Sequence, residues 1–450
     1  MTISLRNVLL VVGVAALYIL EGSTTFWIFS GSWDSALKML NFALIGAIMS
    51  LGVNLQWGFA GLFNIGIMGF VALGGLATVL VAMPTTPGAW SAGGWQIMAG
   101  LAMGAVTIVG AVKMYAYLPK GRLRNLMTFA LIAVGFFAFR AIFDGGVAGV
   151  EAIDPAATGY LGGLNWGGEN YKDFGWLTVV AWPIGGVLAA GAAWIIGKTA
   201  LGLRSDYLAI ATLGIAEIII AVMKNEDWLS RGVKNVNGLP RPVPYEIDLQ
   251  NDLGFVERAA SWGLDPTAAS TLYTKMGYAI LFTVFLVALL WLAQRALNSP
   301  WGRMMRAIRD NEVAAEAMGK NVTARHLQIF ILGSAICGIA GAMMTTLDSQ
   351  LTPTAYQPLR FTFLIWVMVI VGGSGNNFGA VLGGFLIWWL WVMVEPLGLW
   401  IAEVTTAGFE VDHWFRIRME DAAAHFRLFT MGLVLLLVLR FSPRGLMPEK

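Results

Sequence analysis

Long apolar runs recur along the whole chain, and they constrain its fold more than any other feature of the sequence. A helix needs about 20 largely apolar residues to cross the hydrocarbon core of a bilayer, and the chain supplies such runs repeatedly. Runs such as 431–439 do not alternate between apolar and polar residues, as the strands of a transmembrane barrel would. Only 12% of the 450 residues are charged, against roughly 25% in a soluble domain. The sequence therefore predicts helices that cross a membrane many times.

The predicted fold class is all-α: a polytopic transmembrane helical bundle of about ten to twelve spans, with broken or re-entrant helices. Residues 1–450 are expected to form a single transmembrane domain. The first span follows Arg6 and is expected to stay uncleaved, because Glu21 and polar residues replace the small residues of a signal-peptide cleavage site. The predicted spans are Val8–Ile28, Ala36–Leu55, Gly66–Met83, Trp95–Val112, Leu126–Phe143, Trp176–Ile196, Tyr207–Met223, Met276–Leu292, Leu327–Thr345, Phe361–Val371, Ala380–Ile401 and Leu428–Leu439.

Lys and Arg are concentrated in alternate connections between these spans, and such connections stay on the cytoplasmic side of a membrane. This rule predicts that both termini are cytoplasmic and that residues 295–326 form a cytoplasmic loop. Residues 224–274 and roughly 403–427 then become long outer connections, which are either docking surfaces or loose linkers. The basic residues that set this orientation are Lys113, Lys120, Arg122, Arg124, Lys198, Arg204, Arg295, Arg303, Arg306, Arg309, Lys320, Arg325, Arg440, Arg444 and Lys450.

Two uncharged, glycine-rich segments interrupt the predicted spans, at 54–66 and at 372–379. Irregular backbone is tolerated at membrane depth only where protein buries it or where it lines a wet cavity, so both segments are candidates for a translocation pathway. The alternatives are close helix packing with amide hydrogen bonds for the first segment and a tight cytoplasmic turn for the second. The candidate pathway residues are Asn54, Gln56, Gly58, Gly61, Asn64, Gly66, Ser374, Asn376 and Asn377.

Glu217 is the clearest ionisable residue inside a predicted span. A charge at that depth is costly, so intramembrane carboxylates commonly have a function. Glu217 is therefore a further pathway candidate that could meet a substrate ammonium group. The alternative is a carboxyl group that is protonated or bonded to a neighbouring helix.

Several other classes of function are not supported by the sequence. The formal net charge is +2, and the basic residues are scattered over short loops, so nucleic-acid binding is not expected. The one cysteine, Cys337, has no partner for a disulfide, and the three histidines lie far apart, so no metal site or cofactor is expected. No catalytic motif is present, and the chain is not expected to be an enzyme.

The most informative polar stretch runs from Ser299 to Lys320 within the predicted cytoplasmic loop. It contains a helical pattern, a glycine stop and a second helical start. Met304, Met305 and Ile308 give it an apolar side while arginines and acidic residues give it a charged one, as expected for a helix that docks on a soluble partner. A plain interfacial helix is the alternative.

Four segments make the chain resemble the permease subunits of branched-chain amino acid ABC importers, of the LivM type. The resemblance is strongest in the loop 302–319, with its Gly-Arg-x-x-Arg-Ala-Ile-Arg core, and it extends to 203–214, 372–384 and 441–446. In that family the loop contacts the ATPase. The residues that the resemblance implies for ATPase coupling are Gly302, Arg306, Ala307, Asp310, Glu312, Ala314 and Gly319.

The resemblance implies a subunit of an ATP-driven, binding-protein-dependent importer of branched-chain or related amino acids. It implies a bacterial inner membrane location and a heterodimer with a second permease subunit, together with two cytoplasmic ATPase subunits and a periplasmic solute-binding protein. Segments 62–67 and 234–239 depart from the usual family pattern, so the pathway chemistry is expected to differ. An extra helix pair is also predicted between residues 95 and 143. Import of urea or short-chain amides is an alternative within the class, and an ion-coupled secondary transporter is the alternative outside it.

Overall fold

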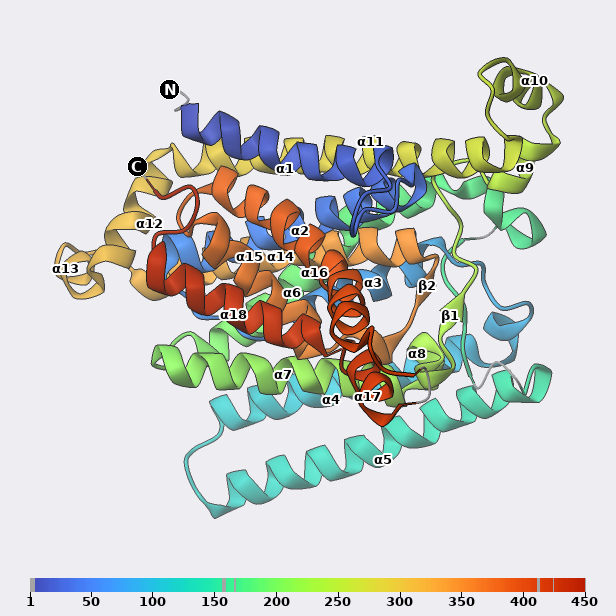
Figure 1. Cartoon of the computed structure of the whole chain (residues 1–450). Helices are drawn as coiled ribbons and strands as arrows, with labels where there is room; N and C mark the ends of the chain where they lie inside the picture. The colour runs from blue at the N-terminus through green and yellow to red at the C-terminus, as the bar shows by residue number, and fades with distance from the viewer. Residues whose placement is uncertain (1–4, 156–158, 166, 411–412, 424, 450) are drawn as a thin grey trace.

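The computed structural model describes residues 5–155, 159–165, 167–410, 413–423 and 425–449, and its described part is built almost entirely of helices (Figure 1). Each of the twelve predicted apolar runs coincides with a helix, so the predicted fold class is confirmed. These helices are α1 (Leu5–Ser23), α2 (Trp33–Ala60), α3 (Ile67–Ala82), α4 (Trp95–Tyr117), α5 (Arg122–Ile153), α6 (Trp176–Ala200), α7 (Ser205–Asn225), α11 (Pro266–Leu297), α14 (Val322–Asp348), α15 (Leu364–Gly372), α16 (Asn377–Thr406) and α18 (Phe426–Phe441).

Within the described residues, nine helices are long and apolar enough to cross a membrane. α17 (Trp414–Ala423) and α18 form a bent pair, and the number of such spans rises to ten if this pair counts as one span. Ile67–Ala82 and Arg360–Gly372 are apolar but shorter, and both begin next to an irregular segment. The sequence predicted up to twelve spans, and these two shorter helices make up the difference from ten.

The core of the bundle consists of α2, α3 and α14 with α6 and α16 packed around them. Small residues let these helices approach closely, as is usual where lipid supplies no hydrophobic drive for association. A Cβ atom at Gly74 of α3 would lie 1.8 Å from the carbonyl oxygen of Gly338 on α14. Glycine is therefore required at this crossing, and the core is held at backbone-to-backbone distance.

The helices α4 and α5 form a hairpin that lies apart from this core, in the cyan part of Figure 1. Only 17% of the α4 span and 11% of the α5 span are buried, compared with 78% of the α2 span. The two helices close on each other where Gly93 of a preceding π-helical turn (Trp90–Gly94) meets Gly146. Phe143 packs edge-on against Trp228 at 5.4 Å. The hairpin lies where the sequence predicted a helix pair between residues 95 and 143.

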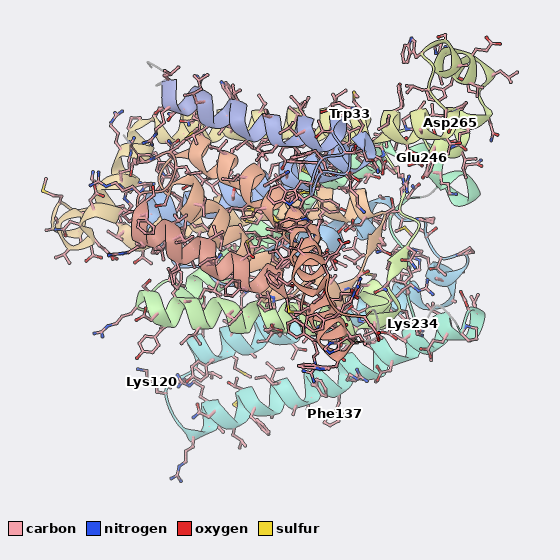
Figure 2. All side chains as sticks on the ribbon, in the orientation of Figure 1. Trp33, Lys120, Phe137, Lys234, Glu246 and Asp265 are labelled. Carbon is pink, nitrogen blue, oxygen red and sulfur yellow. The ribbon has the colours of Figure 1, made fainter. Side chains whose placement is uncertain are left out.

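Opposite ends of the bundle differ in structure. Both termini lie at one end with α12 (Pro300–Asp310), α13 (Glu312–Ala317) and the turn of the α4–α5 hairpin around Lys120 (Figures 1 and 2). We call this the α12 end. α9 (Glu246–Asn251) and α10 (Leu253–Ser261) lie at the other, which we call the α10 end. The basic connections are therefore gathered at one end, as the charge pattern predicted.

The long connection at the α10 end is folded, and it is shorter than expected. α11 already begins at Pro266, whereas the sequence placed the end of the connection at 274. The connection contains α8 (Asp227–Ser230), a 3₁₀ turn (Gly232–Lys234), α9, α10 and β1 (Val236–Asn237), which pairs antiparallel with β2 (Gln350–Leu351). The second long connection includes α17, and its residues 411, 412 and 424 lie outside the described ones. The remaining short elements are 3₁₀ turns at Gly168–Phe174 and Pro353–Ala355 and a π-helical turn at Leu359–Phe363.

The first predicted break is shorter than the sequence suggested. α2 continues without interruption to Ala60, so the expected break at 54–60 is wrong and only residues 61–66 are irregular. α2 ends at Gly61, which has the left-handed φ of +69° and donates its N–H to the carbonyl of Trp57 at 2.9 Å. The second break lies where it was predicted, and its irregular part is 373–376, between α15 and α16.

Candidate coupling helices and translocation site

The helices α12 and α13 form an amphipathic pair at the α12 end of the bundle. Asn311 separates them, and its side chain caps α13 by accepting a hydrogen bond from the backbone N–H of Ala314 at 2.9 Å. Gly302, Met305 and Ile308 are buried against the bundle. The opposite face of the pair is exposed in this chain, as a surface that docks on a soluble partner must be.

The seven predicted coupling residues divide between the two faces of this pair. A Cβ at Gly302 would lie 2.1 Å from the carbonyl oxygen of Leu297, so the buried position requires glycine. Arg306 is half-buried and donates to the same carbonyl at 3.1 Å. The exposed members are Ala307, Asp310, Glu312, Ala314 and Gly319.

Arg309 links α12 to the bundle, although the sequence did not single it out for coupling. Its guanidinium donates to the carbonyl of Gly58 on α2 and to the Glu449 carboxylate at 2.8 Å. It also donates to Asp310 at 3.1 and 3.2 Å. Burial lowers the pKa of Arg309, but the hydrogen bonds and charges of Glu449 and Asp310 outweigh it and raise the pKa above its ordinary value. Arg309 is therefore a permanent cation that joins α12, α2 and the C-terminal segment.

The two predicted pathway segments meet at Asn54. Its side-chain amide nitrogen donates to Asn377 Oδ1 at 2.9 Å, and its side-chain oxygen Oδ1 accepts from the backbone N–H of Gly375 at 2.9 Å. Asn376 caps α16 through the N–H groups of residues 378 and 379 and donates to the carbonyl of Met447 at 3.2 Å. Ser374 is exposed and lies outside this network. The second break is thus tied to the last two turns of α2 on one side and to the C-terminal segment on the other.

The other pathway amides bind helices together at the first break. Gln56 donates to the carbonyl of Phe330 at 2.9 Å and to Ser334 at 3.0 Å, both on α14. Asn64 donates to Gln56 Oε1 at 2.9 Å and accepts from the N–H of Gly66 at 2.9 Å. Gln56 and Asn64 are each only 1% exposed, so the irregular segment after α2 is buried in protein.

Glycines at this break allow close approach of neighbouring backbones. A Cβ at Gly58 would lie 2.3 Å from the N–H nitrogen of Gly375, and one at Gly66 would lie 2.3 Å from the carbonyl oxygen of Thr212 on α7. Gly61 supplies the left-handed end of α2. The structure therefore places these predicted residues at a junction of α2, α7, α14 and the second break.

Glu217 lies elsewhere. It is exposed on the outer face of α7, opposite the buried residues Leu208, Thr212 and Ile220. No ion pair joins it to another residue in the part of the chain that the structure describes. The carboxylate is thus separated from the pathway candidates around Asn54, and it faces whatever surrounds this chain.

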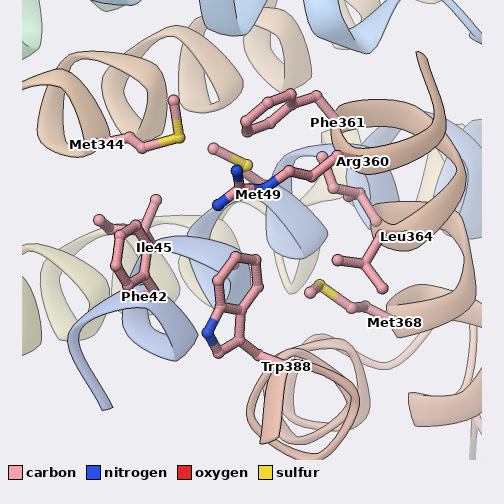
Figure 3. Close-up of a pocket in the computed structure, with 11 residues that line it drawn as sticks. Phe42, Ile45, Met49, Met344, Arg360, Phe361, Leu364, Met368 and Trp388 are labelled. Atoms are coloured by element: carbon pink, nitrogen blue, oxygen red, sulfur yellow. The ribbon is translucent and has the colours of Figure 1, made fainter. Parts of the chain in front are cut away.

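A small pocket between α2, α14, α15 and α16 contains a charged residue that the sequence analysis missed. Figure 3 shows the guanidinium of Arg360 reaching into the pocket beside Met49 and Phe361. The space left between the lining side chains is about 10 Å³, enough for about one water molecule. Except for Arg360, every lining residue is apolar, aromatic or glycine: Phe42, Ile45, Gly46, Met49, Met344, Phe361, Leu364, Ile365, Met368 and Trp388.

Arg360 lacks a partner that matches its charge. Its guanidinium lies 5.2 Å from the ring of Phe361 and 5.7 Å from that of Trp388, which is weak compensation. Within the described residues it forms no ion pair, and its buried Nε atom has no hydrogen-bond acceptor. Ionisable residues that face the interior of a membrane bundle are rare and commonly functional, so this half-buried arginine is a candidate for function.

A signal for Arg360 exists in the sequence. The residue directly precedes the apolar run 361–371, which by the predicted topology starts from the outer side. Basic residues favour the cytoplasmic side of a span, so an arginine at this position is an exception to the rule. Such an exception indicates a residue that is retained for a reason other than orientation.

Comparison with known proteins shows similarity to one family over most of this architecture. The family model described as "Branched-chain amino acid transport system / permease component" matches residues 156–439, from just after α5 to near the end of α18. No solved structure matches the chain. The matched region contains α12, α13, the second break and Arg360, and it leaves out the α4–α5 hairpin.

The individual relatives match smaller parts of this chain than the family model does. The "High-affinity branched-chain amino acid transport system permease protein LivM" of Escherichia coli (strain K12) is 27% identical over 223 residues, 49% of this chain and 51% of the relative. The "Probable branched-chain amino acid transport permease protein LivM" of Methanocaldococcus jannaschii is 28% identical over 261 residues, 58% of this chain and 64% of the relative. The "Fructose import permease protein FrcC" of Rhizobium meliloti is 30% identical over 114 residues, 24% of this chain and 31% of the relative.

The chain thus spans about half of the length of the E. coli relative and just under two thirds of the archaeal one. The family match, in contrast, covers well over half of this chain. Together with the apolar helices, it identifies a multi-pass membrane protein. The chain belongs to the family of permease components of branched-chain amino acid transport systems, and it is of the LivM type.

Proposed function

We propose that this chain is the membrane-spanning permease subunit of an ATP-driven, binding-protein-dependent importer of branched-chain or related amino acids. The observation that carries the proposal is the α12–α13 pair, which is exposed on one face and joined to α2 through Arg309 on the other. A permease that does not bind nucleotide itself needs such a surface, because a separate ATPase can move the membrane helices only through a direct contact with the permease. Family membership supports the same conclusion.

Two cytoplasmic ATPase subunits are the proposed partners of this surface, one on this chain and one on a second permease subunit. Closure of the ATPases pushes on α12, and Arg309 transmits the displacement to the Gly58 carbonyl and to Glu449. The C-terminal segment passes it on, because the N–H groups of Leu446 and Met447 bond to the carbonyls of residues 371 and 372 at 2.8 and 2.9 Å. A small shift at α12 therefore biases the packing at both breaks, as required for a two-state permease.

A periplasmic solute-binding protein is the proposed partner at the α10 end. Leu253, Trp262 and Ile247 are 78%, 76% and 68% exposed there, on a folded connection outside the apolar helices. Large exposed apolar side chains of this kind favour a protein partner over water. The α12 end, with both termini, is then cytoplasmic, and the proposed location is a bacterial inner membrane.

The proposed second permease subunit forms a heterodimer with this chain within the lipid bilayer. Glu217 supports a protein neighbour, because a carboxylate on the exposed face of α7 is poorly solvated by lipid tails. The same exposure means that Glu217 no longer supports the alternative of an ion-coupled secondary transporter.

The test is transport by the complex that co-purifies with this chain, reconstituted into liposomes with its binding protein. We expect uptake of radiolabelled leucine that requires ATP on the side of the α12–α13 pair. The double variant Arg306→Ala with Glu312→Ala should lower uptake, while Arg140→Ala on the α4–α5 hairpin should not. Uptake by the chain alone, driven by an ion gradient, would contradict the proposal, and ATP-dependent uptake of urea without leucine would replace the proposed substrate class.

A further inference from the structure

The pocket around Arg360 has the chemistry of a binding site for an anionic, otherwise apolar molecule. A cation reaches into it from the start of the short apolar helix, and the rest of the lining is hydrophobic (Figure 3). An arginine fork binds a carboxylate through two parallel hydrogen bonds. The apolar walls suit an aliphatic group attached to that carboxylate.

Two of the side chains that line this pocket carry a donor without a hydrogen-bond acceptor among the described residues. The Arg360 Nε atom and the indole Nε1 atom of Trp388 are both buried without an acceptor. Both side chains line the same pocket. Buried polar groups are nearly always hydrogen-bonded, so the Arg360 Nε atom has room for an acceptor that the described residues do not supply.

The nearest opposite charge does not satisfy Arg360. The carboxylate of Asp348, at the end of α14, acts on Arg360 electrostatically, yet the two residues form no ion pair within the described part of the chain. Lys38 and Arg427 add two further positive charges nearby, Lys38 acting on Asp348 and Arg427 acting on Arg360. Arg427 is itself paired with Glu395, whereas Arg360 forms no ion pair within the described residues, which favours an anion over a cation in the pocket.

We propose that this pocket is a carboxylate-binding site on the translocation pathway, which holds an α-amino acid with an apolar side chain through Arg360; the proposal rests on the importer function proposed above. The space of about 10 Å³ is too small for an amino acid, so the proposal requires the lining side chains to move apart during transport. Met49, Met344 and Met368 line it, and methionine side chains repack readily around different contents. A π-helical turn at 359–363 adjoins the pocket, and such turns are common at functional sites.

This site also separates the substrate classes considered above. An uncharged ligand such as urea or a short amide gains little from a guanidinium in an apolar pocket. A zwitterionic amino acid with an aliphatic side chain matches both the charge and the walls. In this proposal, Arg360 contributes to the selectivity of transport after the binding protein has delivered the solute.

The first experiment uses the wild-type complex in liposomes during ATP-driven turnover. An arginine-selective dicarbonyl reagent is added, and modification of Arg360 is measured by mass spectrometry. We expect leucine to protect Arg360, whereas leucinol, which keeps the side chain and the amine but lacks the carboxylate, should not. Equal protection by the two compounds, or none by either, would overturn the proposal and leave Arg360 a structural residue held by aromatic rings.

The second experiment compares Arg360→Gln with Arg360→Lys, which keeps the charge without the fork. We expect Arg360→Gln to lower the number of leucine molecules imported per ATP hydrolysed by about tenfold or more, with a smaller loss for Arg360→Lys. Arg140→Gln is the matched control, because Arg140 is half exposed and pairs with Asp144 on the α4–α5 hairpin, away from the pocket. A purely structural role would lower ATP hydrolysis and import together.

The outcomes distinguish this site from the function on which it depends. If the wild-type complex imports no leucine, the proposed importer function fails. If it imports leucine and Arg360→Gln does so with an unchanged ratio to ATP hydrolysis, the carboxylate site alone fails. If Arg360→Gln does not assemble, the protection experiment on the wild-type complex decides.

Discussion

Replacing Arg309 by glutamine will loosen α12 from the bundle without changing its exposed face. The side chain donates to the Gly58 carbonyl, and a hydrogen bond from a charged group contributes about 1.5 kcal/mol. The ion pair with Glu449 is 25% and 29% exposed, so solvent screening limits its contribution to about 0.5 kcal/mol. The two together favour the docked position of α12 by about 2 kcal/mol, which corresponds to about 30-fold in the equilibrium between docked and undocked states.

Hydrogen exchange followed by mass spectrometry measures this equilibrium, because amides in a locally opened segment exchange with solvent. In the Arg309→Gln variant, peptides that cover 300–310 should exchange about 30-fold faster, while peptides from the core of α14 should be unchanged. Arg303→Gln is the matched control on the same helix, since Arg303 is exposed and donates to the Asn298 carbonyl at 3.4 Å. Equal exchange in the two variants would refute the idea that Arg309 anchors α12.

Two other predictions concern the core and the topology. Gly74→Ala should lower the unfolding temperature of the detergent-purified chain by an amount that corresponds to about 1–3 kcal/mol, because its Cβ would meet the Gly338 carbonyl, whereas Gly191→Ala, with no atom within 4 Å of the added Cβ, should not. In intact cells with a permeable outer layer, an impermeant maleimide should label Trp262→Cys at the α10 end but label Val313→Cys on α13 only after the membrane is opened; the reverse pattern would contradict the proposed orientation.

The apolar runs predicted the helices well because the length of a membrane span is set by the bilayer and is visible locally. The charge pattern likewise predicted which connections share an end. Helix ends were less predictable: Asn54 and Gln56 look like helix breakers in isolation, but α14 and the second break supply their hydrogen-bond partners. Those partners are remote in sequence, so the continuation of α2 to Ala60 could not be deduced from local composition.

The candidate site was predicted in part. The α12–α13 pair was found from its amphipathic pattern, but Arg309 was not, because its partners Gly58 and Glu449 are remote in the chain. Arg360 was missed for a different reason. It stands at the edge of an apolar run, where basic residues usually reach the water at the membrane surface, and only the folded chain turns it inward.

The hydrogen bonds of α2 have a consequence for biogenesis. Its amides bond to residues 274 positions later, at Phe330, and 323 positions later, at Asn377. At a synthesis rate of about 5–20 residues per second, the second of these partners emerges from the ribosome roughly 15–65 s after Asn54 does. The α4–α5 hairpin finds its own partner within one short stretch of chain and has no such delay. Until those partners are made, the side-chain N–H groups of Asn54 and Gln56 lack them, so α2 depends on the insertion machinery to shield these groups during synthesis.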